Sequence, residues 1–84
     1  MIDFDSAPDF VNEKGVKWWR EHMLCKYARS KGLKGISVWR VELPDGMRNY
    51  VVVDGGQAVK ESQRLEDVGV WLDVESILKS KKFF

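Results

Sequence analysis

The sequence contains a single cysteine, only two prolines and no long apolar run. One cysteine excludes an internal disulfide, so the fold cannot be a small cysteine-rich scaffold. Spanning a bilayer takes about 18 consecutive apolar residues, and no segment approaches that length. The sequence begins Met-Ile-Asp-Phe-Asp, which is acidic where a secretory signal is basic. We therefore expect a cytoplasmic protein that does not associate with membranes.

A disordered chain is excluded by what the sequence does contain. Of its 84 residues, 44% are hydrophobic and 12% are aromatic, which is typical of globular proteins. This length leaves room for one hydrophobic core. We therefore expect a single α+β domain over residues 1–84. Residues 1–11 are expected to be an irregular lead-in, and residues 80–84 a short basic and aromatic tail.

Hydrophobic spacing predicts a first helix from about residue 12 to residue 30. Asn12 is a favourable N-cap, and Gly32 is a favourable stop. At 3.6 residues per turn, one apolar stripe of this helix is expected to face the core. It consists of Val16, Trp19, Met23 and Tyr27. Trp18 lies on the opposite side among basic residues, so we expect it to be exposed, whereas Trp19, Trp39 and Trp71 suit the core.

Three strands and a second helix are predicted after the first helix. The strands are rich in β-branched residues and are separated by a Pro-Asp-Gly turn and an Asp-Gly-Gly turn. In order, they are residues 36–43, 47–53 and 57–61. The second helix is expected to begin at Ser62 or Gln63. Residues 68–74 also alternate with a period of two, so a strand is the alternative there.

The expected fold is α-β-β-β-α, a three-stranded antiparallel meander packed against two helices. This order is similar to that of the double-stranded-RNA-binding domain. The resemblance implies RNA binding through a lysine-rich cluster at the start of the last helix. Here the corresponding segment is mixed and partly acidic, so the resemblance is limited to topology. That segment reads Ser62-Gln63-Arg64-Leu65-Glu66-Asp67.

The net charge of +1 combines segments of opposite sign. Residues 1–13 carry four carboxylates and no lysine or arginine, whereas residues 14–34 carry seven lysines and arginines and one glutamate. Such a basic segment either binds an anionic partner or is the solvated face of a helix. If it binds a partner, the candidate residues are Lys17, Trp18, His22, Lys26, Arg29, Lys31 and Lys34.

Catalytic and metal-binding patterns are weak in this sequence. His22 and Cys25 lie three residues apart on one helix face, but a zinc site needs three or four ligands. No glycine-rich loop of the phosphate-binding kind is present. We therefore expect no enzymatic activity, metal, cofactor or small-molecule substrate.

The sequence is most typical of a small interaction module, a regulator or inhibitor that binds another protein or a second copy of itself. Binding is expected through the first helix or the sheet face, with Trp18 as an anchor, because Trp, Tyr and Arg dominate interface energies. Small proteins that phages direct against host systems have this size and shape. The alternative is a nucleic-acid-binding domain that uses residues 14–34, with cations meeting phosphates and rings stacking on bases.

Overall fold

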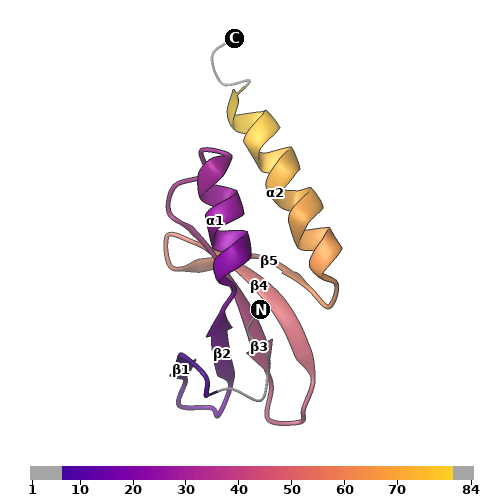
Figure 1. The fold of residues 1–84 in the computed structure, drawn as a ribbon. Helices are drawn as coiled ribbons and strands as arrows, with labels where there is room; N and C mark the ends of the chain where they lie inside the picture. Colours follow the sequence, from indigo (N-terminus) through magenta and orange to yellow (C-terminus); the bar gives the residue numbers. More distant parts are fainter. Residues whose placement is uncertain (1–6, 81–84) are drawn as a thin grey trace.

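The computed structural model describes residues 7–80, so the first six residues and most of the expected tail, 81–84, lie outside it. Two helices pack on one face of a five-stranded antiparallel sheet with the order β1-β2-β3-β4-β5 (Figure 1). The prediction of a small α+β fold is confirmed. The prediction of only three strands is wrong, because two further strands precede α1. No helix within residues 7–80 is long and apolar enough to cross a membrane.

The predicted meander is present almost residue for residue. Its strands are β3 (Ile36–Glu42), β4 (Arg48–Asp54) and β5 (Gln57–Ser62). Val38 lies opposite Val52 in the register of β3 and β4. Gly46 in the first turn and Gly55 and Gly56 in the second have positive φ angles, which glycine adopts without steric cost. Turn chemistry therefore determines where these strands end.

The first half of the predicted helix is instead a β-hairpin. It consists of β1 (Phe10–Val11) and β2 (Lys17–Arg20), joined by a turn. The side-chain oxygen of Asn12 accepts hydrogen bonds from the backbone N–H groups of Lys14 and Val16 at 2.9 and 3.0 Å. Asn12 therefore caps a turn rather than a helix, using the same side-chain chemistry. Gly15, with φ of +82°, completes the turn.

Helix α1 (His22–Ser30) is shorter than predicted and buries a different face. Met23, expected in the core, is 72% exposed, and Tyr27 is also exposed, whereas Cys25 and Ala28 are buried. The Cys25 thiol lies against β3, where its sulfur accepts a hydrogen bond from the Val38 N–H at 3.3 Å. The small side chains of Cys25 and Ala28 let the helix approach the sheet closely. Cys25 is thus a packing residue.

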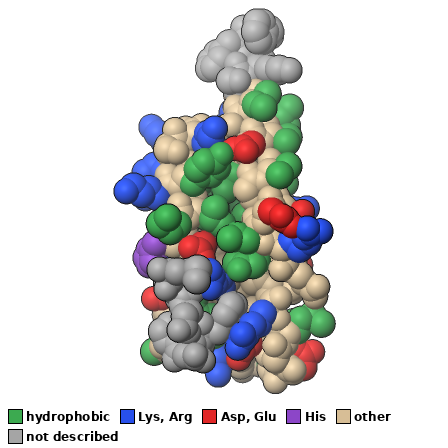
Figure 2. Space-filling model, turned by 45° about the vertical axis from the view of Figure 1, so that its right-hand side comes forward, with side chains coloured by type: hydrophobic (Ala, Val, Ile, Leu, Met, Phe, Trp, Pro, Cys, Tyr) green, Lys and Arg blue, Asp and Glu red, His purple; other side chains and the backbone are tan. Residues whose placement is uncertain are grey.

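Helix α2 (Leu65–Ser80) confirms the helical prediction for residues 68–74. Val68 and Leu72 are fully buried on the sheet side, and they share one core cluster with Cys25, Ala28 and Val38. Its outward side is also apolar, and Figure 2 shows hydrophobic side chains along the outer edge of this helix. The exposed residues are Val70, Val74, Ile77 and Leu78.

A buried ion pair joins the start of α1 to the sheet. Glu21 precedes the helix, and its carboxylate accepts a hydrogen bond from Arg40 Nε at 2.7 Å. Both side chains are more than nine-tenths buried. The Arg40 guanidinium also lies 5.6 Å from the centre of the Tyr50 ring. The pair therefore fixes the junction between β2 and α1, on the helix-covered face of the sheet.

Candidate binding surface

The sheet face that points away from both helices carries aromatic side chains. Side chains alternate between the two faces of a strand, so Trp39 lies opposite to its core-facing neighbour Val38. The register places Phe10 beside Trp18, and Arg20 beside Trp39. The side chains of Phe10, Trp18 and Trp39 border a shallow hollow of about 280 Å³. We call it the aromatic hollow, and it is lined by Phe10, Trp18, Ser37, Trp39, Val53 and Gly56.

The two tryptophans of the aromatic hollow pack against each other. Their ring centres are 5.9 Å apart and the ring planes meet at 82°, an edge-to-face arrangement. Both rings are half-buried. Trp18 was expected to be exposed on a helix and Trp39 to lie in the core, and the strand geometry corrects both. The guanidinium of Arg20 lies 5.6 Å from the Trp39 ring centre, which favours a cation–π contact.

The indole N–H groups of these two tryptophans differ in their hydrogen bonding. Trp39 Nε1 donates to Ser37 Oγ at 2.9 Å, whereas Trp18 Nε1 is buried without an acceptor. A buried donor without a partner costs about 1–3 kcal/mol. Trp18 is therefore held in place by packing rather than by a hydrogen bond.

We predict that Trp18→Phe changes the free energy of unfolding by less than about 1 kcal/mol, because relief of the unsatisfied N–H offsets the lost ring area. Trp39→Phe is the matched control and should cost about 1 kcal/mol more, since it breaks the bond to Ser37. Urea denaturation of the two variants measures the difference. An equal loss of stability in the two variants would contradict the difference in hydrogen bonding between the two indole N–H groups.

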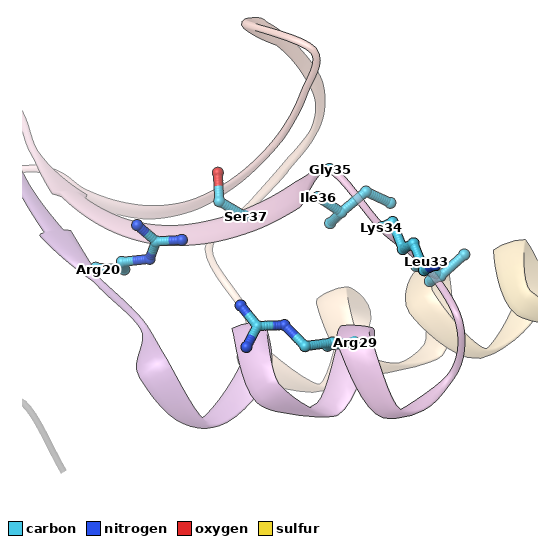
Figure 3. A pocket seen from close by; sticks show the side chains of 7 residues that line it. All are labelled: Arg20, Arg29, Leu33, Lys34, Gly35, Ile36 and Ser37. Carbon is cyan, nitrogen blue, oxygen red and sulfur yellow. The ribbon is translucent and has the colours of Figure 1, made fainter.

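A basic pocket lies beside the hollow, where β2 ends and α1 passes the start of β3. It has a volume of about 480 Å³. Figure 3 shows the guanidinium groups of Arg20 and Arg29 turned toward each other across it. Among residues 7–80, its lining contains cations and no carboxylate; these residues are Arg20, Arg29, Leu33, Lys34, Gly35, Ile36 and Ser37. Ser37 also lines the aromatic hollow, so the two surfaces are continuous.

A second pocket, of about 340 Å³, continues along the outer side of α1. Its lining in the described part of the chain also lacks a carboxylate and consists of Arg20, His22, Cys25, Lys26 and Arg29. Figure 2 shows lysine and arginine side chains on the α1 side of the molecule, with the histidine below them. His22 is exposed and the Cys25 thiol faces the β3 backbone. Within residues 7–80, no three His, Cys, Asp or Glu side chains gather as metal ligands.

The structure therefore brings together only part of the sequence-predicted site. His22, Lys26, Arg29 and Lys34 line the two pockets. Trp18 lies in the adjoining hollow. Lys17 is on β2 opposite Glu42, and so points to the other face from Trp18. Lys31 turns toward α2, where its amine lies 3.7 Å from the Asp73 carboxylate.

Lys31 belongs to a polar contact between the two helices. The Tyr27 hydroxyl donates a hydrogen bond to Asp73, and the Lys31 amine lies 5.4 Å from the Tyr27 ring centre. This hydrogen bond is the largest influence that raises the pKa of Tyr27 above its ordinary value; partial burial and the negative charge of Asp73 add to it. The neutral phenol is the form that donates this hydrogen bond. The contact therefore contributes fully to the stability of the fold below the ordinary tyrosine pKa, and this contribution is lost as pH rises through the raised pKa of Tyr27.

We expect an alkaline absorbance titration to detect this shift. The protein should show a tyrosine transition above the usual range, and Tyr27→Phe should remove that transition. Asp73→Ala should return the pKa of Tyr27 toward its ordinary value, because both the acceptor and the negative charge are gone. A titration of Tyr27 that Asp73→Ala does not change would contradict the contact.

The sequence alone did not single out Phe10, Arg20 or Trp39 as site residues. Arg20 was assigned to the middle of a helix, and Trp39 to the core. The available signal was the period-two alternation of residues 36–42, which puts Ser37 and Trp39 on one face. This alternation alone could not show that both α1 and α2 pack on the opposite face.

No protein-family model, curated protein or solved structure matches this chain.

Proposed function

We propose that the protein is a non-enzymatic binding module that uses the sheet face pointing away from α1 and α2 to bind a protein partner. The aromatic hollow supports this proposal. It presents two tryptophans, Phe10 at 55% exposure and an arginine at its edge. These are the residue types that contribute most of the energy in protein interfaces.

The charges around the hollow indicate the chemistry of that partner. Arg20 packs on Trp39 and also lines the basic pocket, so a molecule seated in the hollow lies next to several cations. A matching partner presents a large apolar side chain to the hollow and carboxylates to the arginines. Complementary charge of this kind accelerates encounter and fixes the register of the complex.

Affinity capture from a lysate of the native cells tests the proposal with two matched variants. Phe10→Asp places a charge in the hollow, whereas Met23→Asp places one on the exposed side of α1. Loss of a strong interface contact should lower the recovery of the partner about 30-fold for Phe10→Asp and leave it unchanged for Met23→Asp. Equal recovery with both variants, or loss with Met23→Asp alone, would exclude the sheet face.

Nucleic acid is the second candidate ligand, and the two carboxylate-free pockets favour it. Cations that follow one groove beside aromatic rings can bind single-stranded nucleic acid through phosphate contacts and base stacking. The net charge of +1 is low for a nucleic-acid-binding domain, so nucleic acid is the less favoured of the two ligands. Nuclease treatment before capture separates the two candidates. A protein partner survives nuclease, whereas recovery that depends on intact nucleic acid would replace the first proposal with the second.

A further inference from the structure

The basic pocket holds two guanidinium groups that face each other, and none of the residues 7–80 that line it carries a carboxylate. Arg20 comes from the end of β2 and Arg29 from the last turn of α1 (Figure 3). Within residues 7–80, the ion pairs involve other side chains. Two like charges that converge in a pocket repel each other. A bound anion offsets this repulsion because both cations attract it.

We propose that the basic pocket binds a phosphate monoester between Arg20 and Arg29. Guanidinium groups bind phosphate oxygens through paired N–H donors, so two of them can hold one phosphoryl group from two sides. The site does not depend on the protein partner proposed for the sheet face. It would accept the phosphoryl group as a free ligand or as part of a larger molecule.

The number of charges favours a monoester over a diester or a carboxylate. A phosphate monoester carries a charge of about −1.5 to −2 at neutral pH, whereas a diester or a carboxylate carries one negative charge. The two positive charges of the guanidinium groups match the charge of the monoester. A monoester also has three terminal oxygens, so both arginines can be engaged at once.

The surroundings of the pocket fit such a ligand. Lys34 adds a third cation to the lining, and about 480 Å³ leaves room for the group that carries the phosphate. Two carboxylates border the site. Asp9 accepts a hydrogen bond from the Arg20 backbone N–H at 2.8 Å, and Asp54 lies next to Gly35. They reduce the surplus of positive charge but do not line the pocket, and the positive charge that remains attracts a dianion more strongly than a monoanion.

NMR titration of the isotopically labelled protein at constant ionic strength tests the proposal. The monoester probes are inorganic phosphate, O-phosphoserine and adenosine monophosphate, and the comparison probes are dimethyl phosphate and acetate. We expect saturable shifts at Arg20, Arg29 and Ser37 with a Kd of about 1–10 mM for the best monoester, and at least tenfold weaker binding of both comparison probes. The ranking of the three monoesters identifies the source of the phosphoryl group.

Two variants make this result specific. Arg29→Gln should weaken monoester binding about tenfold, because one charge-assisted contact is lost. Lys31→Gln removes one positive charge two residues away, on the α2 side of α1, and should leave binding unchanged. Amide spectra of both variants report whether the fold is intact. Equal binding of dimethyl phosphate, equal effects of the two variants, or shifts that do not saturate would each overturn the proposal.

Discussion

Replacement of Glu21 with alanine should destabilise the protein by about 3–5 kcal/mol. Glu21 forms the buried ion pair with Arg40, and its removal leaves the Arg40 Nε–H buried without that carboxylate. A domain of this size is stable by roughly 4–13 kcal/mol in total. The variant should therefore lose a large share of its stability and unfold at a much lower urea concentration.

Most of this cost arises because Arg40 loses the Glu21 carboxylate at a buried position, where water does not readily replace it, rather than from a large net benefit of the pair. The double variant Glu21→Leu with Arg40→Met should accordingly recover most of the lost stability, because apolar side chains of similar volume can replace a buried ion pair. Urea denaturation monitored by tryptophan fluorescence measures all three proteins. A loss below about 1 kcal/mol for Glu21→Ala would show that water reaches the pair.

Replacement of Leu72 with alanine is the second large effect and should cost about 2–5 kcal/mol. Leu72 is fully buried where α2 meets the sheet, and its removal leaves a cavity in the core cluster that it shares with Val38 and Val68. Leu78 provides the matched control, since it lies on the same helix and is 55% exposed. Leu78→Ala should cost less than about 0.5 kcal/mol. Similar losses for both would contradict the packing of α2.

The strands after residue 35 and the second helix could be predicted because their signals are local. Two turns rich in glycine and aspartate separate β3, β4 and β5, and the apolar spacing around Val68 and Leu72 indicates α2. The hairpin of β1 and β2 could not be predicted with the same rules. An asparagine side chain that accepts two backbone N–H bonds occurs both at helix starts and in turns, and Asn12 does the latter.

The buried face of α1 was missed for a related reason. Extending the helix back to residue 12 placed Trp19 and Met23 on one apolar stripe, although Trp19 lies on β2 and Met23 faces solvent. The helix buries Cys25 and Ala28, whose small size matters more here than their hydrophobicity. The preference for small side chains at these positions depends on the distance between helix and sheet, which cannot be read from the sequence.

The candidate site was predicted in part because only its cations are close together in the sequence. His22, Lys26 and Arg29 recur at helical spacing and do share one surface. Their aromatic neighbours come from β1, β2 and β3, and strand pairing alone brings Phe10 and Trp39 to the same hollow. A site assembled across strands is visible only once the register is known.

Site-specific photo-crosslinking in native cells tests the central claim most directly, namely that the sheet face pointing away from α1 and α2 binds a protein partner. Benzoylphenylalanine is placed at one position at a time: Phe10 in the aromatic hollow, Met23 on α1 or Val70 on α2, all exposed. We predict a discrete protein adduct from position 10 that persists after nuclease treatment, and none from positions 23 and 70. An adduct from position 23 or 70, with none from position 10, would contradict the claim.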